Sequence, residues 1–520
     1  MLNSPPSTAL VPIDTEKYRL SPVIFAALGM AASYYGLPLF AAAGTGGLHL
    51  LFGVLFLFAA AISFIQVFRF YPRADFSPAD NALLSRLGIL LVAAAVGFAL
   101  GLAARQSVIP PAQTGLPYER VTAVSGILRE DPRSLQRGSG LGSLQLSGVS
   151  GAGGLRASAR GSLTVFFPAE TIPRLREFGR GSEIYADGVL TYGARGPVFR
   201  ATSVHIVKPA PPLEQFRTGL RITLLDTFTA RQDSPTPPVW GALASALLLG
   251  VRDDLDTEFS SAFFNSGTSY ILALSGMHLA IISGILAFFI RRPLGIRRAS
   301  LVGALFITFY VFVAGPLPSL VRSAIMYIIG TFALWTLLKK KVLAVLSMAF
   351  IIQLVWQSGM GLSLSFILSY TALAGMVTLG AVFHGLFRGR LPEIINKGIS
   401  ASLGAFIATA PIVAFYFGSL RPIGIVAGLA VAVLCTVFMA AALAALVAAF
   451  LPLPLWALFD FALTWIYRTI DFTVSLAARV PSIPVSNPVP VLIFSGLLCL
   501  LVLAIKKRDD AYRNSVAAFT

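Results

Sequence analysis

Long apolar stretches almost free of charge are the feature that most constrains what this chain can fold into. Windows of about 17–25 residues of this kind recur along the sequence, and this is the length that crosses a hydrocarbon core roughly 30 Å thick. Of the 520 residues, 56% are hydrophobic and only 12% are charged. That is about half the charged fraction of a soluble globular protein. The sequence therefore predicts a polytopic α-helical membrane protein.

The apolar runs predict about twelve membrane spans in two groups. An N-terminal group within residues 1–104 has spans at about 22–42, 48–68 and 86–104. A bundle at 239–505 has spans at about 266–290, 300–316, 320–337, 342–358, 362–385, 398–418, 424–450, 455–475 and 490–505. The span at 455–475 is the weakest, because it carries Asp460, Arg468 and Asp471. The apolar stretch 239–250 is too short for a span and is expected to be re-entrant or interfacial.

The distribution of basic residues predicts the topology. Clusters at 291–298, 339–341, 388–390 and 506–508 fall in alternate connections between the spans. Because lysine and arginine are enriched in cytoplasmic loops, these connections are expected in the cytoplasm. Both termini, including the tail 506–520, are then cytoplasmic, and the predicted location is the cytoplasmic (inner) membrane. The net charge of +17 has the same explanation, with contact to a polyanion as the alternative.

Residues 105–212 differ in character from the rest of the chain. Apolar and polar residues alternate at 120–128, 161–167, 182–192 and 197–207, and glycines punctuate these stretches. Alternation with period two predicts short strands, and about five of them suit an OB-like β-barrel. The topology places this domain outside the cytoplasm. Within it, the segment 138–154 is rich in glycine and serine and is expected to be a mobile loop. The connector 213–238 begins amphipathic and is expected on the membrane surface or packed on the bundle.

Charged residues at membrane depth are costly, so they mark a partner or a watery cavity. Arg322 and Ser319 lie in "GPLPSLVRSAIM" (315–326), and the alternative for Arg322 is an anchor that reaches the interface. Arg252 and Asp253 follow a short apolar helix at the outer rim. They are either an interfacial cap or the charged rim of a pore, where Arg252 could meet phosphate.

The stretch "LALSGMHL" (272–279) places a histidine inside an apolar run. On a helix Ser275 and His278 share a face, and Gly276 begins a ridge of small residues that admits a neighbouring helix. His278 therefore either bonds across a helix contact or lines a proton relay or pore. Ser365 in the span at 362–385 is open to the same two interpretations. Arg421 is expected in an outer loop, against the charge rule.

The sequence holds no signature of an enzyme. The four histidines are scattered, and neither a Gly-rich phosphate loop nor a serine nucleophile elbow is present. We therefore expect no catalytic residues, no metal site, no cofactor and neither ATPase nor nuclease activity.

Three segments resemble the ComEC competence DNA-channel family. The segment 246–282 resembles its main signature, while 315–326 and 361–366 resemble two shorter ones. The order of spans, outer β-domain and bundle is also similar. Two departures stand out: Tyr270 replaces the first histidine of the signature, and the chain resembles the short form without a C-terminal metallo-β-lactamase-like domain.

The resemblance implies a channel that imports single-stranded DNA in natural transformation. Implied partners are single-stranded DNA, membrane lipid, an extracytoplasmic DNA receptor, a cytoplasmic helicase or single-strand-binding protein, and a possible second copy. The residues expected along the path are Arg252, Asp253, Ser275, Gly276, His278, Ser319, Arg322, Ser365 and Arg421. The residues of an OB-like domain that could contact bases are Phe166, Phe167, Tyr185, Tyr192, Phe199 and Arg200. Most of these aromatic side chains are nevertheless expected in the core of the domain. The rival functions are an ion-coupled solute transporter and a membrane scaffold whose β-domain binds a partner.

Overall fold

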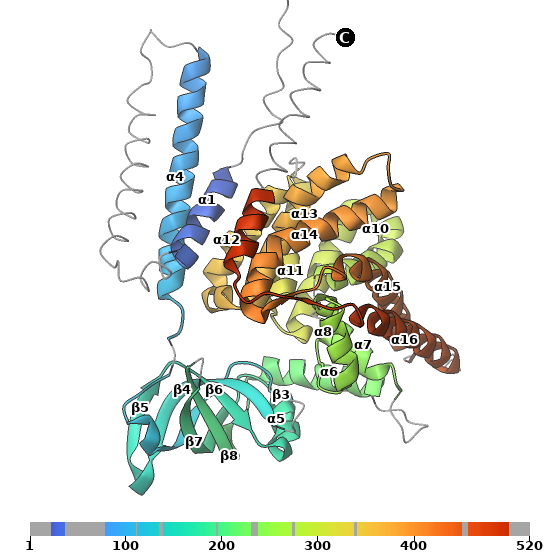
Figure 1. Ribbon diagram of the computed structural model, residues 1–520. Coiled ribbons are helices and arrows are strands. Elements are labelled where there is room, and N and C mark those ends of the chain that lie inside the picture. The colour runs from blue at the N-terminus through green and yellow to red at the C-terminus, as the bar shows by residue number, and fades with distance from the viewer. Residues whose placement is uncertain are drawn as a thin grey trace, which may run out of the picture. The chain divides into compact units, whose positions relative to one another are not determined.

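The computed structural model describes residues 22–36, 78–110, 112–134, 139–193, 196–229, 238–272, 276–336, 341–449 and 456–498 (Figure 1). Among these residues, six helices are long and apolar enough to cross a membrane: Gly88–Gln106, Gly276–Ala314, Pro318–Trp335, Leu364–Leu386, Glu393–Phe417 and Gly424–Ala448. The predicted span 48–68 lies outside the described residues, and the total of twelve spans stays a prediction. The chain forms two compact units, which we describe separately.

The first unit combines residues 1–106, 339–418 and 485–520. Its described helices are α1 (Pro22–Ala31), the π-helix η2 (Ala32–Gly36), α4 (Pro78–Gln106), α12 (Val342–Trp356), the 3₁₀ helix η6 (Ser358–Leu362), α13 (Leu364–Leu386) and α14 (Glu393–Phe417). The hydroxyls of Tyr34 and Tyr35 donate to the carbonyls of Ser358 and Gly361, so the N-terminal helices hold the turn before α13. The side chain of Ser363 then caps α13 by accepting from the Phe366 amide at 3.2 Å.

The second unit combines residues 107–338 and 419–484. Its β-domain contains β1 (Gln113–Thr114), β2 (Val121–Leu128), β3 (Arg133–Ser134), β4 (Gly140–Gly151), β5 (Arg156–Arg160), β6 (Ser162–Phe167), α5 (Ile172–Phe178), β7 (Glu183–Gly193) and β8 (Gly196–Lys208), with 3₁₀ turns at Tyr118–Arg120, Ala152–Gly154 and Ala169–Thr171. Adjacent strands run in the order β4-β2-β7-β8-β6, and β6 pairs with β4 again, so these strands form a closed ring of pairings. Only β6 and β8 are parallel in this ring. The four predicted strands are confirmed to within a residue.

The segment 138–154 is not the mobile loop that its composition predicts. Residues 140–151 form β4, which pairs with β2, β3, β5 and β6. Its buried positions hold glycine at both ends and leucine or valine between them, whereas serine and glutamine lie at the less buried positions. The glycines are needed for close packing, because a Cβ on Gly142 would lie 2.8 Å from Cε2 of the buried Phe167. The glycine-rich composition therefore predicted a loop where the chain forms a β-strand with alternating buried and exposed positions.

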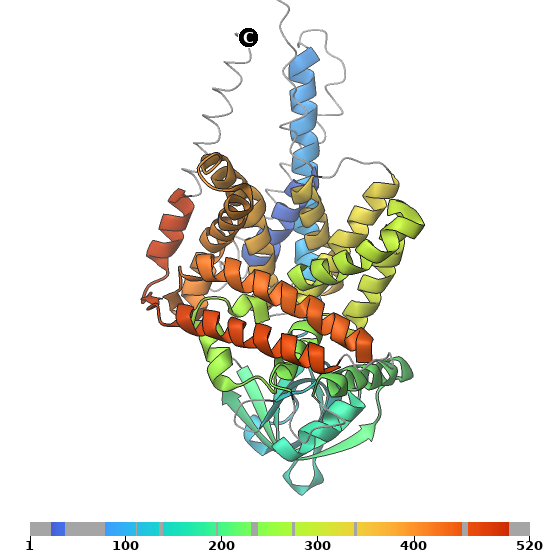
Figure 2. The same cartoon turned by 90° about the vertical axis from the view of Figure 1, so that its right-hand side faces the viewer.

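The remaining elements of the second unit are α6 (Pro212–Thr229), α7 (Gly241–Leu249), α8 (Thr257–Asn265), α9 (Ser269–Leu272), α10 (Gly276–Ala314), α11 (Pro318–Trp335), β9 (Ser419–Leu420), α15 (Gly424–Ala449), α16 (Trp456–Ala478) and β10 (Ile483–Pro484). Figure 2 shows α15 and α16 side by side. The connector helix α6 packs Leu220, Leu224 and Phe228 on this bundle, as one of its two predicted placements requires.

Helix α7 is the short apolar stretch that the sequence could not assign to a span. Eight of its nine residues are buried, and it lies within the apolar core shared with α10, α15 and α16. Trp240, which precedes α7, donates from Nε1 to Oδ1 of Asp460 at 2.9 Å. This carboxylate therefore connects α16 to the start of α7 inside the bundle. Gly250 ends α7 in the left-handed region at φ 72°, a conformation that glycine adopts without a Cβ penalty.

Helix α10 contains the predicted spans 266–290 and 300–316 as two arms. They meet at Gly295, whose φ of 72° and ψ of 164° are not helical, next to Pro293. The first span begins later than predicted, because α8, α9 and the turns around them occupy residues 257–272. The span predicted at 455–475 is the helix α16, but it is not among the six helices that meet the criteria for crossing a membrane.

Candidate functional site

The first turn of α10 meets the second turn of α11 at Gly276. A Cβ on Gly276 would lie 3.1 Å from Nη2 of Arg322 and closer still to Oγ of Ser323. Apolar side chains continue the contact below this point, with Leu279 of α10 in one core cluster with Leu320 of α11. The small residue at 276 therefore lets the Arg322 guanidinium lie against the start of α10.

Arg322 is buried, with only 8% of its surface exposed, and Ser319 one turn earlier is buried as well. Pro318 occupies the first turn of α11, where its missing amide costs no helical hydrogen bond. This start places Arg322 in the second turn, where it faces α10 and not the outside of the helix pair. The anchor interpretation requires a guanidinium that extends outward, so the burial favours the interpretation in which Arg322 contributes to a polar site.

His278 is fully buried in the first turn of α10 and lies within electrostatic reach of Arg252. Arg252 belongs to the turn between α7 and α8. Although it is an exposed residue, the protein atoms around its guanidinium and the positive charge of Arg133 lower its pKa. Arg133 lies on β3 of the β-domain. We call Arg133, Arg252, His278 and Arg322 the basic cluster, because separate elements bring them to one end of α10.

The residue after Arg252 faces the β-domain. Asp253 accepts a hydrogen bond from the backbone amide of Ser134 at 3.2 Å and forms an ion pair with Arg176 of α5. Burial raises the pKa of the Asp253 carboxyl, although the charge of Arg176 opposes this. The neighbouring residues Arg252 and Asp253 therefore have different roles, since one joins the basic cluster and the other fastens the β-domain.

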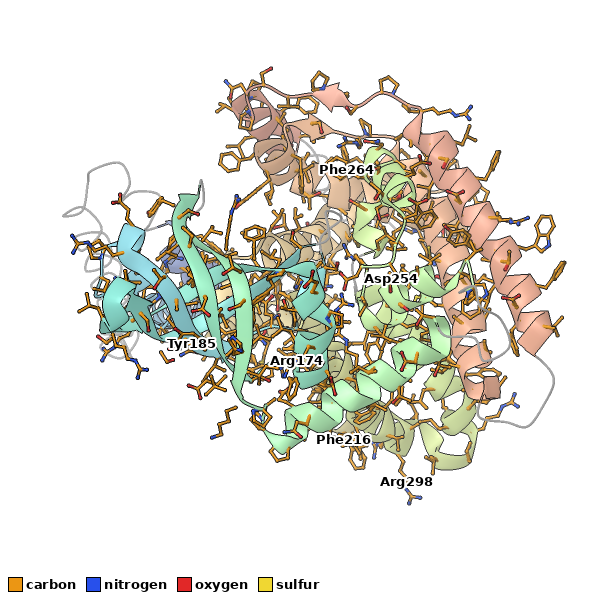
Figure 3. The ribbon with its side chains drawn as sticks, turned by 90° about the horizontal axis from the view of Figure 1, so that it is seen from below. Arg174, Tyr185, Phe216, Asp254, Phe264 and Arg298 are labelled. Atoms are coloured by element: carbon orange, nitrogen blue, oxygen red, sulfur yellow. The ribbon has the colours of Figure 1, made fainter. Side chains whose placement is uncertain are left out.

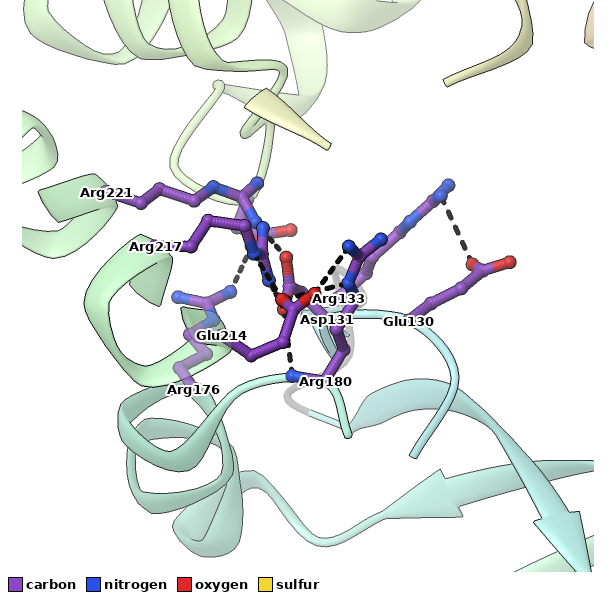
Figure 4. Close-up of polar contacts among 9 residues, drawn as sticks. Glu130, Asp131, Arg133, Arg176, Arg180, Glu214, Arg217 and Arg221 are labelled. Atoms are coloured by element: carbon purple, nitrogen blue, oxygen red, sulfur yellow. Dashed lines mark hydrogen bonds and ion pairs between the residues drawn. The ribbon is translucent and has the colours of Figure 1, made fainter. Parts of the chain in front are cut away.

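Two further carboxylates join the β-domain to α6 (Figure 4). Asp131, in the turn after β2, binds Arg217 of α6 at 2.6 Å and also pairs with Arg221. Glu214 of α6 binds Arg217 at 2.7 Å and Arg180 at 2.6 Å. Together these contacts form what we call the ionic latch: Asp131, Arg176, Arg180, Glu214, Arg217, Arg221 and Asp253.

The latch is buried enough for its charges to depend on one another. Burial alone would raise the pKa of the Asp131 carboxyl, but the hydrogen bond from Arg217 and the charges of Arg221 and Arg217 outweigh it and lower that pKa. The pKa of Glu214 is likewise lowered by Arg180 and Arg217 against the effect of burial. Both carboxylates are thus ionised in the folded protein, and removing one would leave arginines buried without their partner.

Arg421 has contacts that explain it without a ligand. Its guanidinium lies 4.2 Å from the ring centre of Phe264, which Figure 3 labels. Nη1 also donates to Oγ of Ser419 at 2.9 Å, and Nη2 lies 3.4 Å from Oδ1 of Asn265. Arg421 therefore fastens the turn before α15 to α8 and is not part of the basic cluster.

The other predicted path residues are not brought together in the same way. Ser275 lies outside the described residues, so its relation to His278 stays a prediction. Ser365 is exposed in the first turn of α13, which belongs to the first unit. Tyr270, at the position of the signature histidine, is about half exposed, and its hydroxyl lies near Gly428 of α15.

The candidate residues of the β-domain separate by face. Phe167 and Phe199 are buried in its core, so their rings are not open to a base, which corrects both residues as stacking candidates. Phe166 and Arg200 are paired neighbours on the parallel strands β6 and β8, and Arg200 is exposed. Tyr192 is 74% exposed, whereas Tyr185 is partly buried.

Sequence reasoning missed Arg133 and most of the latch. Asp131, Arg176, Arg180, Arg217 and Arg221 each resemble an ordinary surface charge in sequence. One signal was available, because Arg217 and Arg221 are four residues apart and therefore lie on the same side of the connector helix. Among the described residues, no group of histidine, cysteine and acidic side chains could hold a metal ion.

Known proteins match this chain mainly in its second half. The family model described as "Competence protein" matches residues 247–508. ComE operon protein 3 of Bacillus subtilis (strain 168) is 28% identical over 292 residues, which are 53% of this chain and 36% of that relative. The chain thus matches about a third of the relative's length, and no solved structure matches it. Because the family model covers half of the sequence and includes α10, α11 and the turn with Arg252, the chain belongs to the competence protein family.

Proposed function

We propose that this protein is a channel of the cytoplasmic membrane that imports single-stranded DNA during natural transformation, and that the strand enters at the basic cluster. Membership of the competence family is consistent with DNA uptake, and the six apolar helices indicate a membrane location. The observation that carries the proposal is that two arginines lie near the start of α10, since Arg322 lies against Gly276 and Arg252 is within electrostatic reach of His278. A phosphate chain cannot cross hydrocarbon, so it needs fixed positive charge where it leaves water.

We infer that the β-domain is an OB-like barrel that holds the strand outside the membrane. Two features support this inference: the closed ring β4-β2-β7-β8-β6, and the helix α5, which lies between β6 and β7 in the chain. OB folds bind single strands with basic side chains and exposed aromatic rings. Phe166, Arg200 and Tyr192 offer these groups on the outer side of the strands.

The contacts of the β-domain suggest how a strand would pass inward. Arg133 lies on β3 and is close enough to Arg252 for its positive charge to lower the pKa of the Arg252 guanidinium. Arg252 in turn lies within electrostatic reach of His278 in the first turn of α10. Arg133, Arg252 and His278 therefore lie within electrostatic reach of one another in this order, from the β-domain to the first turn of α10. We propose that phosphates contact them in this order, with Arg322 next to Gly276.

The proposal is tested by complementing a deletion strain with Arg322→Gln and measuring internalised, labelled DNA. We expect uptake of DNA to fall at least tenfold while the amount of protein in the membrane is unchanged. The reason is that a guanidinium holds a phosphate with charge-assisted hydrogen bonds, which the neutral glutamine side chain does not form. Arg421→Gln serves as the matched control, since Arg421 is held by Phe264 and Asn265 outside the cluster. Uptake that is normal with Arg322→Gln, or equally reduced in the control, would contradict a site at the cluster.

The rival functions make other predictions for the deletion strain. A solute transporter would leave DNA uptake unchanged and alter the flux of an ion or small molecule. A scaffold would lose its role when the β-domain is removed but not when Arg322 is changed. Normal DNA uptake in the deletion strain itself would refute the channel proposal for this chain.

A further inference from the structure

The break in α10 carries the most concentrated exposed charge among the described residues of the second unit. Residues 291–298 read "RRPLGIRR", and all eight are exposed. Leu294 and Ile296 lie between the two arginine pairs and are 39% and 50% exposed. Figure 3 shows Arg298 pointing away from the helices. We call this segment the arginine tip.

Internal packing does not explain the arginine tip. Within the described part of the chain, none of its four arginines forms an ion pair, in contrast to the arginines of the latch. A Cβ on Gly295 would meet nothing within 4 Å, so the surroundings of the break are open. The two exposed aliphatic side chains lie between four arginines, and this combination suits a partner that is both anionic and apolar.

The place of the tip on α10 indicates which partner this is. The first arm extends from Gly276 to Leu294 within the tip, a helical length of roughly 27 Å, which approaches the thickness of a hydrocarbon core. Phe288 and Phe289 are about 70% exposed just before the tip. Thr331 of α11 lies beside Ser300, so the exposed Trp335 is near the same end. Arginines, a tryptophan and short aliphatic side chains at the ends of apolar helices match the headgroup level of a bilayer.

We propose that the arginine tip is a binding site for anionic phospholipids, with the guanidiniums on the headgroup phosphates and Leu294 and Ile296 among the upper acyl carbons. A guanidinium can hold a phosphate with two hydrogen bonds, and the two pairs on either side of Gly295 can hold separate headgroups. This site lies at the opposite end of the α10 arms from the basic cluster. It does not depend on the proposed channel function.

The test uses the full chain in nanodiscs of phosphatidylcholine mixed with phosphatidylglycerol of the same acyl chains. Native mass spectrometry then counts the phosphatidylglycerol molecules that stay bound to the protein. We expect enrichment of phosphatidylglycerol for the wild-type chain. Two variants test this: Arg297→Gln/Arg298→Gln, and a quadruple variant that adds Arg291→Gln/Arg292→Gln. Each arginine removed should lower the preference for phosphatidylglycerol by about fivefold.

Two controls separate a lipid site from a general effect of charge. Arg156→Gln/Arg160→Gln removes the same charge from exposed positions of β5 and should keep the preference. The quadruple arginine-to-lysine variant keeps the charge of the tip and should retain most of it. If the quadruple glutamine variant does not accumulate, the double variant decides the question.

Three results would overturn the proposal. The first is a wild-type chain that does not prefer phosphatidylglycerol, and the second is a tip variant that keeps the wild-type preference. The third is a tip variant that loses binding to a fluorescent oligonucleotide while its lipid preference is unchanged, which would assign the tip to nucleic acid.

Discussion

At the scale of single residues, Gly276 controls how closely α10 and α11 approach. We expect Gly276→Ala to displace the side chains of Ser323 and Arg322, because the added Cβ would lie 3.1 Å from Nη2 of Arg322 and closer to the serine hydroxyl. Both are side chains that can move, so the fold should survive. DNA internalisation should fall several-fold through the altered position of Arg322, as measured by uptake of labelled DNA.

The matched control for this substitution is Gly284→Ala on the same helix. A Cβ at Gly284 meets nothing within 4 Å, and alanine favours helix more than glycine does. We expect Gly284→Ala to leave uptake unchanged and the melting temperature equal or slightly higher. Equal uptake by the two variants would show that the contact at Gly276 does not position Arg322.

The latch should make stability depend on pH in the acid range. The pKa values of Asp131 and Glu214 lie below their ordinary values of 3.8 and 4.5 in the folded protein. Their stabilisation is therefore complete above those ordinary values and is lost as pH falls through the lower folded values. We expect the thermal stability of the purified protein to decrease from about pH 5 downward, and Asp131→Asn to remove part of this slope.

The same variant gives a second measurement at neutral pH. Removing one partner of a buried ion pair costs about 3 kcal/mol, because the remaining charges stay buried. We expect Asp131→Asn to lower the melting temperature at pH 7, whereas the exposed Glu170→Gln in the same domain should not. An unchanged acid slope in Asp131→Asn would show that Asp131 does not carry the pH dependence.

The sequence identified part of the candidate site at this scale. Arg322 was predicted because charge at membrane depth is costly, His278 because it interrupts an apolar run, and Arg252 because it lies at the outer rim. The structure places all three near the start of α10. Arg421 was predicted as an arginine of an outer loop, but its partner Phe264 lies 157 positions earlier in the chain, so no local pattern could show that contact. Arg133 and Asp131 were missed because long-range pairing alone distinguishes them from surface charges.

At the scale of elements, β4 shows how composition can mislead. Its glycines at 140 and 142 face large side chains, and each added Cβ would come within 2.8 Å of Ile172 or Phe167. We expect Gly142→Val to destabilise the β-domain severely, because a side chain cannot fit against the buried Phe167 ring. Thermal unfolding followed by circular dichroism measures this. Ser147→Val on the exposed side of β4 is the control and should be tolerated.

The long helices were more predictable than the short elements. Eighteen or more apolar residues require a helix in a membrane, so α10, α11, α13, α14 and α15 follow from length and composition alone. Helices α7 and α8 have only nine residues each, and their burial depends on neighbours from α10, α15 and α16. The break at Gly295 falls in the basic connection 291–298, which separates the two spans that were predicted there.

At the scale of the whole chain, the two units are built from interleaved segments. The chain leaves the first unit at Gln106 and returns to it at Lys339, then leaves at Gly418 and returns at Val485. The β-domain forms the N-terminal part of the second unit, and the latch fastens it through α6 and through Asp253. Ion pairs from two separate elements hold the β-domain, so they fix its orientation as well as attach it. Breaking one of these ion pairs should therefore also alter the geometry of the other.

The contact between Arg176 and Asp253 tests this coupling, because each residue can be exchanged for the other. We expect Arg176→Asp and Asp253→Arg each to place like charges together, which should increase the mobility of the β-domain relative to the helices of its own unit. Spin labels on an exposed position of β5 and on the exposed side of α15 measure this as a broader distance distribution. The double variant restores an opposite pair and should narrow the distribution again and recover part of the DNA uptake. Arg174→Asp, an exposed exchange on the same helix α5, changes the charge equally and should leave the distribution unchanged. A double variant no better than the single variants would show that the latch does not orient the domain through this pair.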